Sequence, residues 1–262
     1  MNNKVSASDG VELAYRTFGE GSTSVVLIHG WMVSGAVYDD LVEAMGTDGV
    51  RLIVPDLRGT GGSGGADGTY TIEQYAKDVI AVADAAGART FALVGNSMGG
   101  QIAQWIAATE PDRVLGAVLL CSVPASGIAL PEEAQGLFRN SAQSRELQQT
   151  ILGLACKQLE GAARERLLDD AGKIGPACIQ GAFDSWTGAS FADKLGEIRA
   201  AVLVVGTDDP FFPQDFLRQA IASKIKRASL IYFPGPGHYP QVERPRETAA
   251  VVRAFLAPLL QG

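Results

Sequence analysis

Residues 91–108, FALVGNSMGGQIAQWIAA, decide how this chain folds. They contain the pattern GxSxG with Ser97 at its centre, between the apolar run Phe91–Val94 and the helix-forming run Gln101–Ala108. A serine on so sharp a turn has a strained backbone, and its neighbours two residues away must lack bulk. Glycine stands on both sides of this serine. The stretch therefore predicts a strand, a tight turn that exposes the Ser97 hydroxyl, and a helix.

Short apolar runs alternate with amphipathic stretches on either side of this segment, which is typical of a mostly parallel sheet covered by helices. Runs rich in Val, Leu and Ile are expected where a strand is buried on both faces. The predicted strands are Val11–Phe18, Val25–His29, Val50–Val54, Phe91–Gly95, Val114–Cys121, Ala201–Gly206 and Ser229–Phe233. The predicted helices are one that opens with the capping box Thr71–Gln74 and runs to about Ala86, then Ser97–Ala108 and Glu247–Leu256.

The alternation stops between Val123 and about Leu195, where no strand pattern is found. A structureless loop of about 70 residues inside a compact domain would be anomalous. The composition favours helices at Glu132–Phe138, Arg145–Leu159 and Ala162–Ala171. We therefore expect a helical cap over residues 124–195, inserted into a core made of residues 1–123 and 196–262.

Composition and charge exclude several classes of function. Of the 262 residues, 47% are hydrophobic and 19% charged, which favours one folded α/β unit over a disordered chain. A net charge of −7 argues against a nucleic-acid partner, which would need clustered positive charge. No apolar run approaches the roughly 18 residues of a membrane span, and the first ten residues lack the apolar core of a signal peptide. We expect no membrane association and a cytoplasmic protein.

The cysteines and histidines are too few for a disulfide framework or a metal site. The three cysteines, Cys121, Cys156 and Cys178, show no CxxC spacing and are expected to be free thiols in a reducing compartment. Neither an HExxH motif nor a histidine pair is present to bind a metal ion, and no glycine-rich nucleotide loop follows the first strand. We expect chemistry without a cofactor or a metal.

A serine hydroxyl is a poor nucleophile and needs a base, and the chain offers two histidines. His29 ends an apolar strand next to Gly30, and we interpret it as structural. His238 lies in the loop PGPGHYP, residues 234–240, which follows a predicted strand and can carry a side chain over the edge of the sheet. His238 is therefore the favoured base.

The acid and the oxyanion-hole donors that a serine nucleophile also needs can be predicted from their positions along the chain. Asp208 and Asp209 come directly after a predicted strand, between the serine and the histidine, and either can supply the carboxylate that orients the imidazole. Two backbone N–H groups should stabilise the developing oxyanion. We expect one from Met98, after the nucleophile, and the other from Trp31, in the loop that follows Val25–His29.

Five segments together resemble the α/β-hydrolase fold family over essentially the whole chain. They are His29-Gly30, Asp56–Ser63 (DLRGTGGS), Gly95–Gly100 (GNSMGG), Gly206–Pro213 (GTDDPFFP) and Gly237–Pro245 (GHYPQVERP). In that family they correspond to the oxyanion loop, a mainly structural segment, the nucleophile elbow, the acid segment and the histidine segment. Thr60 and Gly62 stand where the family often has His and a basic residue.

The resemblance implies a mostly parallel eight-stranded sheet flanked by helices, with an inserted helical cap. It places the acid at Asp209, because the spacing GxxDxxxP selects that residue over Asp208. A serine nucleophile separates this chain from the epoxide and haloalkane hydrolases of the fold, which use aspartate.

We expect hydrolysis of a small or medium carboxylic ester or lactone through an acyl-enzyme. Because this fold hosts many chemistries, three alternatives stay open. They are a C–C bond hydrolase of ring-fission products, a cofactor-free haloperoxidase or perhydrolase, and a ligand receptor with little turnover. The predicted substrate contacts are aromatic: Trp31, Phe138, Phe183, Trp186, Phe211 and Phe212. The sequence does not indicate an oligomeric state.

Overall fold

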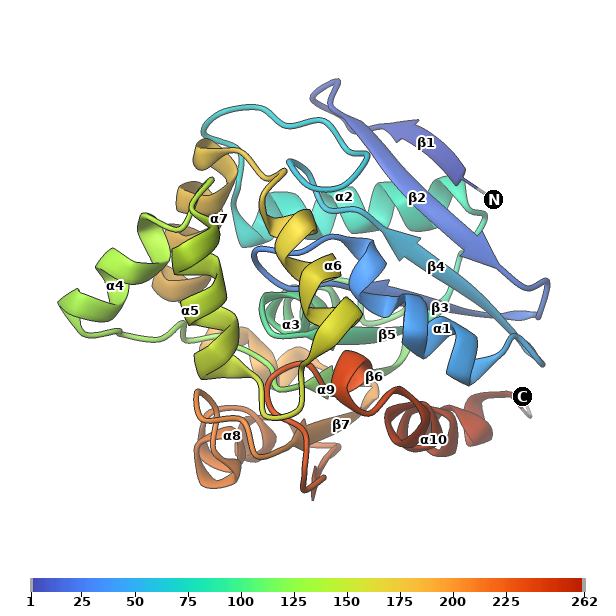
Figure 1. Ribbon diagram of the computed structural model, residues 1–262. Helices are drawn as coiled ribbons and strands as arrows, with labels where there is room; N and C mark the ends of the chain where they lie inside the picture. Colours follow the sequence, from blue (N-terminus) through green and yellow to red (C-terminus); the bar gives the residue numbers. More distant parts are fainter. Residues whose placement is uncertain (1, 261–262) are drawn as a thin grey trace.

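The computed structural model describes residues 2–260, which form one eight-stranded sheet with helices on both faces (Figure 1). The strands are β1 (Asn2–Ser6), β2 (Glu12–Phe18), β3 (Thr23–Ile28), β4 (Val50–Pro55), β5 (Phe91–Asn96), β6 (Val114–Leu120), β7 (Ala201–Gly206) and β8 (Ala228–Tyr232). Their order in the sheet is β1-β2-β4-β3-β5-β6-β7-β8. The pairs β1–β2 and β2–β4 are antiparallel and all the others are parallel, which confirms the predicted fold class.

The strand pattern identified every strand except the first. β1 has the sequence NNKVS and lies at the edge of the sheet, where its residues are exposed or half-buried. An edge strand needs neither an apolar run nor burial on two faces, so its sequence carries no strand signal of that kind. The central strand β3 is buried throughout, with Val26 paired to Ile53 on one side and to Leu93 on the other.

Ten α-helices lie within the described residues, six in the part that alternates with strands. These six are α1 (Asp39–Met45), α2 (Ile72–Ala85), α3 (Met98–Thr109), α8 (Gln214–Ala220), α9 (Pro240–Glu243) and α10 (Pro245–Leu256). The Thr71 side chain accepts a hydrogen bond from the Gln74 amide at 3.2 Å, so the predicted cap of α2 is confirmed. Short 3₁₀ turns, η1 (Gly35–Tyr38), η2 (Ala192–Glu197), η3 (Ala222–Lys224) and η4 (Ala257–Leu260), complete the connections.

Four helices lie between β6 and β7: α4 (Glu132–Arg139), α5 (Arg145–Ala155), α6 (Gly161–Ala171) and α7 (Pro176–Gly188). They gather at one end of the sheet (Figure 1). The residue pattern predicted the first three and missed α7, which begins with proline at its first turn and contains two glycines, Gly181 and Gly188. Glycine lowers helix propensity, so α7 is stabilised mainly by packing against the rest of the protein. That residues 124–195 form a separate cap stays a prediction.

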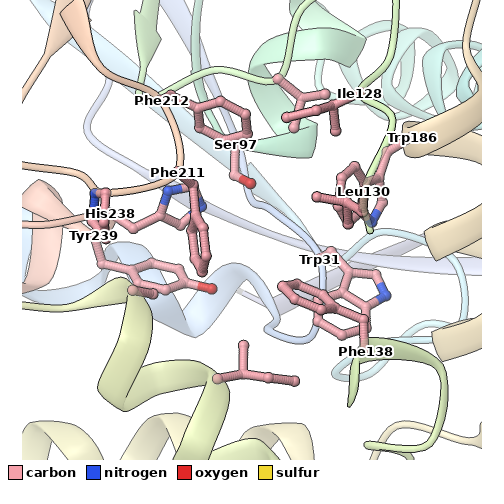
Figure 2. A pocket seen from close by; sticks show the side chains of 14 residues that line it. Trp31, Ser97, Ile128, Leu130, Phe138, Trp186, Phe211, Phe212, His238 and Tyr239 are labelled. Atoms are coloured by element: carbon pink, nitrogen blue, oxygen red, sulfur yellow. The ribbon is translucent and has the colours of Figure 1, made fainter. Parts of the chain in front are cut away.

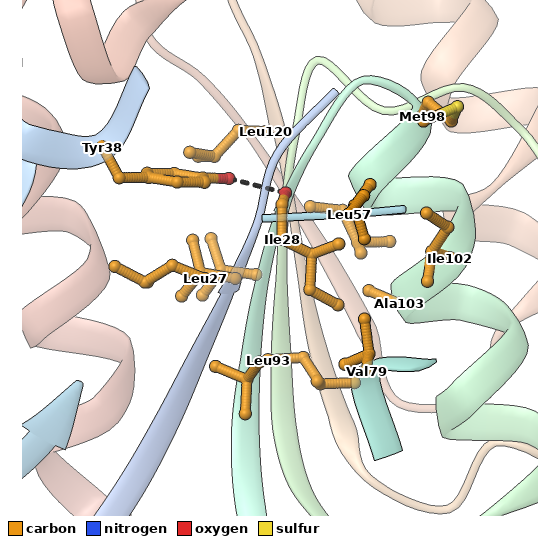
Figure 3. Close-up of a cluster of buried hydrophobic side chains, with 14 of the residues drawn as sticks. Leu27, Ile28, Tyr38, Leu57, Val79, Leu93, Met98, Ile102, Ala103 and Leu120 are labelled. Carbon is orange, nitrogen blue, oxygen red and sulfur yellow. Dashed lines mark hydrogen bonds between the residues drawn. The ribbon is translucent and has the colours of Figure 1, made fainter. Parts of the chain in front are cut away.

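The core is packed on both faces of the sheet (Figure 3). Leu27 faces Tyr38 on one side, while Ile102 and Val79 lie on the other, and all four are 0% exposed. The Tyr38 hydroxyl donates to the Ile28 carbonyl at 2.8 Å, so this tyrosine fixes the last residue of β3. The end of β3 leads directly into the loop that contains Trp31.

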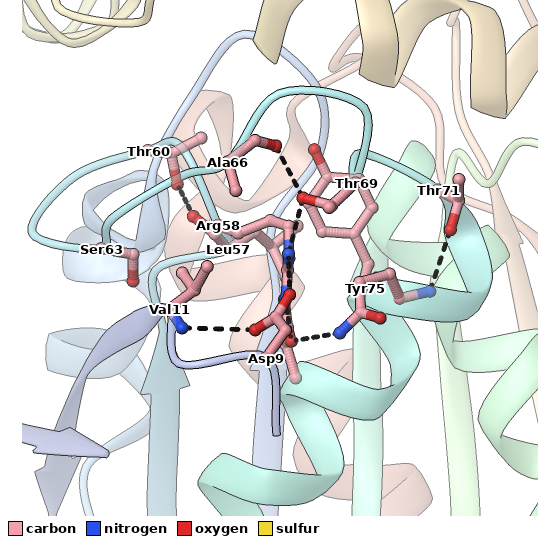
Figure 4. Close-up of polar contacts among 12 residues, drawn as sticks. Asp9, Val11, Leu57, Arg58, Thr60, Ser63, Ala66, Thr69, Thr71 and Tyr75 are labelled. Carbon is pink, nitrogen blue, oxygen red and sulfur yellow. Dashed lines mark hydrogen bonds and ion pairs between the residues drawn. The ribbon is translucent and has the colours of Figure 1, made fainter. Parts of the chain in front are cut away.

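A buried ion-pair network holds the segment that resembles DxRGxGxS (Figure 4). The Arg58 guanidinium is fully buried and donates to both carboxylate oxygens of Asp78, at 2.5 and 2.7 Å. It also donates to Asp9 at 2.8 Å and to Thr69 at 2.7 Å, and its hydrogen bond to Asp9 lowers the pKa of that carboxyl. A buried guanidinium needs such partners, because an unpaired buried charge is strongly destabilising. The network ties this loop to α2.

Among residues 2–260, no helix is both long and apolar enough to cross a membrane.

Candidate active site

Ser97 lies on the turn between β5 and α3 with φ of 56°, a left-handed backbone conformation that is rare for a residue other than glycine. Close packing forces this turn. A Cβ atom on Gly95 would lie 2.4 Å from the Gly99 carbonyl oxygen, and one on Gly99 would lie 2.0 Å from the Ile28 carbonyl oxygen. Only glycine fits either position, so the GxSxG spacing is required by backbone contacts within the elbow and between the elbow and the end of β3.

His238 and Asp209 meet through their side chains. The His238 Nδ1 and the Asp209 Oδ2 are 2.8 Å apart, and both residues are buried. The second oxygen of Asp209 accepts the Phe211 amide at 2.9 Å, which fixes the carboxylate. Asn96 donates to the His238 carbonyl at 2.9 Å and so joins the histidine loop to β5. With Nδ1 bound to the carboxylate, Nε2 is the ring nitrogen that can exchange a proton.

Asp208 has different partners from its neighbour. Its side chain is exposed and accepts hydrogen bonds from the Tyr232 hydroxyl and from the Gly235 amide, the latter at 2.9 Å. The Tyr232 hydroxyl is the main cause that lowers the pKa of Asp208. Of the two aspartates, Asp209 is the one hydrogen-bonded to His238.

The other histidine, His29, is fully buried and has different hydrogen-bond partners. Its Nδ1 bonds to the Gly30 carbonyl at 2.8 Å, and its Nε2 accepts the Leu57 amide at 2.9 Å. Burial lowers the pKa of His29, which keeps the ring neutral. It joins the end of β3 to the loop after β4, and both of its ring nitrogens are engaged in hydrogen bonds.

The loop after β3 lies against the elbow. A Cβ on Gly30 would be 3.0 Å from the Ser97 Cβ, and the next residues are Trp31 and Met32, whose φ is 65°. The Met98 amide is the first of α3, where a helix leaves its N–H groups free. Within residues 2–260, neither the Trp31 nor the Met98 amide donates to another protein group. Both can therefore donate to a ligand oxygen.

Ser97 and His238 line one cavity of about 200 Å³ (Figure 2). Apart from these two, the lining residues are Trp31, Val123, Ile128, Leu130, Phe138, Ile151, Ala155, Trp186, Pro210, Phe211, Phe212 and Tyr239. The wall is thus apolar and largely aromatic, and His238 is its one titratable group besides the Tyr239 phenol. Helices α4, α5 and α7 supply Phe138, Ile151 and Trp186, so the inserted helices form part of the wall.

One predicted contact needs correction. Phe183 is 1% exposed and does not line the cavity. Its ring packs on Trp31, Phe138 and Trp186, with ring centroids 6.3, 5.8 and 5.2 Å away. It supports the aromatic wall from behind, because α7 turns Trp186 toward the cavity and Phe183 into the packing between helices.

The aliphatic part of the wall and Tyr239 were not predicted from the sequence. Ile128, Leu130 and Ile151 are ordinary apolar residues, and only the tertiary arrangement distinguishes them from core residues. Tyr239 follows His238 directly, so its position in the histidine loop was a usable signal.

Glu243 connects the histidine loop to α5. Its carboxylate accepts the amides of Lys157 and Gln158 at 2.8 and 2.7 Å, and those of Gly237 and Tyr239 at 3.1 and 3.3 Å. The His238 amide in turn donates to Ala155, the last residue of α5, at 2.9 Å. The position of the His238 imidazole therefore depends on the Glu243 carboxylate, although Glu243 does not line the cavity and is not bonded to the ring.

The cysteines are free thiols, Cys121 and Cys178 buried and Cys156 half-buried. Burial raises the pKa of the Cys178 thiol to about 11, so it stays protonated at neutral pH. Within residues 2–260, no group of three or more His, Cys, Asp or Glu side chains could hold a metal ion.

Comparisons with known proteins agree with this geometry. The family model for the alpha/beta hydrolase family matches residues 25–251. A non-heme chloroperoxidase of Streptomyces lividans is 29% identical, over 92% of this chain and 96% of its own. A 2-hydroxymuconate semialdehyde hydrolase of Pseudomonas putida is 30% identical, over 79% of this chain and 77% of its own.

Among solved structures, an N-acyl homoserine lactone degrading enzyme has a TM-score of 0.83 and 28% identity, over 97% of this chain and all of its own. The family match, the sheet order and the strand–turn–helix geometry at Ser97 agree with one another. The chain belongs to the alpha/beta hydrolase family.

Proposed function

We propose that this protein is a serine hydrolase that cleaves a small or medium, uncharged carboxylic ester or lactone. Ser97 is the nucleophile, His238 the general base and Asp209 the carboxylate that orients the imidazole. The amides of Trp31 and Met98 form the oxyanion hole. One observation carries the proposal: the His238–Asp209 pair, bonded at 2.8 Å, and the strained Ser97 turn open onto the same apolar cavity.

The reaction follows from this arrangement in two halves. Ser97 Oγ attacks the carbonyl carbon as His238 Nε2 takes its proton, and the two amides stabilise the oxyanion. The imidazolium, stabilised by Asp209, then gives that proton to the leaving alkoxide, so that an alcohol departs and an acyl-serine remains. A water molecule, deprotonated by His238, attacks the acyl-serine and releases the acid, and the proton returns to Ser97.

The lining of the cavity supports a neutral substrate. It contains no lysine or arginine among the described residues, and burying an unpaired carboxylate beside aromatic rings would cost several kcal/mol. This argues against the C–C bond hypothesis, since a muconate-type substrate carries a carboxylate. The lactone substrate named for the structural relative is neutral and fits the proposal.

The test compares the wild type with Ser97→Ala on p-nitrophenyl butanoate at neutral pH. We expect steady release of p-nitrophenolate by the wild type and a loss on the order of 10⁶-fold in kcat in the variant, as for other triads. Activity of Ser97→Ala within tenfold of the wild type would contradict the nucleophile. Near-absent turnover of every ester and lactone by the wild type would favour the receptor hypothesis.

Perhydrolysis is the second candidate, favoured by the similarity to a non-heme chloroperoxidase over nearly the whole of both chains. In that reaction hydrogen peroxide replaces water as the attacking group, so that the acyl-serine yields a peracid. Peracid formation from butanoate ester and peroxide, at a rate comparable to hydrolysis, would support it. Hydrolysis alone, with peroxide present, would exclude it.

A further inference from the structure

Tyr239 presents a hydroxyl group to the substrate cavity that the proposed mechanism does not use. The residue is 5% exposed and follows His238, with the two ring centroids 5.1 Å apart and the rings perpendicular. Figure 2 shows the phenol oxygen pointing into the cavity, toward Trp31 and Phe138 on the opposite wall. The side chain is therefore held against the histidine while its polar end faces the place where substrate binds.

The backbone of Tyr239 is fixed without help from the phenol. Its amide donates to Glu243, and its carbonyl accepts the amides of Val242 and Glu243, each at 2.9 Å. Phenylalanine at this position would make the same backbone contacts and the same ring packing. The hydroxyl is thus not required for the loop to fold.

The hydroxyl donates to no protein group among residues 2–260. Burial raises the pKa of Tyr239, so the phenol keeps its proton and remains a hydrogen-bond donor at all physiological pH values. A second donor, the indole Nε1 of Trp186, is buried in the same wall, also without a partner. The Tyr239 hydroxyl, in contrast, faces the cavity, so a ligand oxygen that binds there can accept its hydrogen bond.

We propose that Tyr239 determines substrate specificity by donating a hydrogen bond to a neutral oxygen of the substrate, beyond the carbonyl that Ser97 attacks. The substrate class is then an ester or lactone with an additional ether, keto or amide oxygen. The acceptor is neutral because the cavity lining offers no lysine or arginine to balance a charge. This proposal rests on the proposed function, whose substrate it narrows.

The test uses pairs of esters of equal size that differ by one oxygen atom. For the acyl side, p-nitrophenyl 3-methoxypropanoate is compared with p-nitrophenyl pentanoate. For the alcohol side, 2-ethoxyethyl acetate is compared with pentyl acetate. The quantity measured is the ratio of kcat/KM for the oxygen-containing ester to that for its hydrocarbon analogue. Intrinsic differences in reactivity within a pair cancel when this ratio is compared between variants.

Tyr239→Phe should lower the ratio in at least one pair by about threefold to tenfold, the range for one hydrogen bond. Because Tyr239 lines the cavity, the ratio is compared between variants and not the absolute kcat/KM of either ester. The control is Tyr15→Phe, which removes a hydroxyl from a buried tyrosine of β2 outside the cavity and should leave both ratios unchanged.

Three results would overturn the proposal. If both ratios change less than about twofold in Tyr239→Phe while hydrolysis is intact, the hydroxyl does not bind the additional substrate oxygen. An equal loss on all four esters in Tyr239→Phe would assign the hydroxyl to general support of the site. Absence of hydrolysis of all four esters by the wild type would overturn the proposed function, and this proposal with it.

Discussion

Asp208 and Asp209 are adjacent and chemically identical, but they differ in burial and in hydrogen-bond partners. Asp209 is buried and bonded to His238, whereas Asp208 is exposed and bonded to Tyr232 and a loop amide. On an extended loop, consecutive side chains point in opposite directions, so only one of the two can face the imidazole.

Asp209→Asn should lower kcat by roughly 10⁴-fold, because the amide favours the wrong imidazole tautomer and cannot stabilise the imidazolium. Asp208→Asn is the matched control and should cost less than about tenfold, the scale of lost surface hydrogen bonds. Both variants are measured on one chromogenic ester at neutral pH. A large loss in Asp208→Asn, with Asp209→Asn close to the wild type, would reverse the assignment.

His29 should make stability depend on pH. Its pKa is lowered in the folded protein, so below the usual histidine value of about 6.5 the unfolded chain binds a proton that the folded chain does not. The stability it contributes is thus present above that pH and is lost as the pH falls. The free energy of unfolding should therefore fall between pH 7.5 and pH 5.5.

Urea unfolding of the wild type and of His29→Gln at the two pH values checks this. His238 is present in both proteins, so its contribution cancels in the difference. The wild type should lose more stability on acidification than the variant. The same loss in both proteins would show that His29 is not held neutral by the fold.

The residues of the candidate site differ in how far the sequence could predict them. Ser97 was recognisable because its turn requires glycines at fixed spacing, and His238 because the chain has only one other histidine. Phe183 was misplaced, since an aromatic residue in an amphipathic helix has the same pattern whether it faces a cavity or a neighbouring helix. For the same reason the aliphatic wall could not be predicted.

At the scale of elements, the histidine loop and the end of α5 act as one unit. Four backbone amides, two from each segment, converge on the Glu243 carboxylate. Hydrogen bonds to a charged acceptor are the stronger class. The helices themselves were predictable where caps and amphipathic spacing agree, as in α2, and not where packing overrides propensity, as in α7.

Glu243→Ala should lower kcat by roughly tenfold to a hundredfold and change KM much less, because a displaced imidazole affects proton transfer more than binding. Glu243→Gln, which keeps one acceptor oxygen, should recover part of the loss. The control is Glu247→Ala, which removes an exposed ion pair with Arg244 and should leave kcat unchanged. Wild-type kcat in a folded Glu243→Ala would contradict a positioning role.

In the molecule as a whole, the sheet presents the proposed catalytic groups and the inserted helices enclose them. Seven of the eight strands were predictable because buried strands have distinctive apolar runs, and the edge strand β1 was not. The volume left between sheet and helices was not predictable, since it depends on how α4, α5 and α7 pack. That volume, about 200 Å³, lies below the usual range for ligand pockets and favours short acyl chains.

A series of p-nitrophenyl esters should therefore give the highest kcat/KM at about four acyl carbons, with a fall of at least about tenfold by ten carbons. Ile151→Ala enlarges the cavity and should move the optimum to longer chains. Leu154→Ala on the same helix is the control, because Leu154 is 51% exposed and outside the lining. An optimum at ten carbons in the wild type, or one that Ile151→Ala does not move, would contradict the enclosed cavity.

Labelling with a neutral ethyl p-nitrophenyl alkylphosphonate tests whether Ser97 forms the covalent bond to the substrate. This reagent reacts with an activated serine to give a stable adduct and one equivalent of p-nitrophenolate. We expect one phosphonyl group per chain, located by peptide mass spectrometry on Ser97, and no labelling of Ser97→Ala. An adduct on another residue, or equal labelling of Ser97→Ala, would contradict the account.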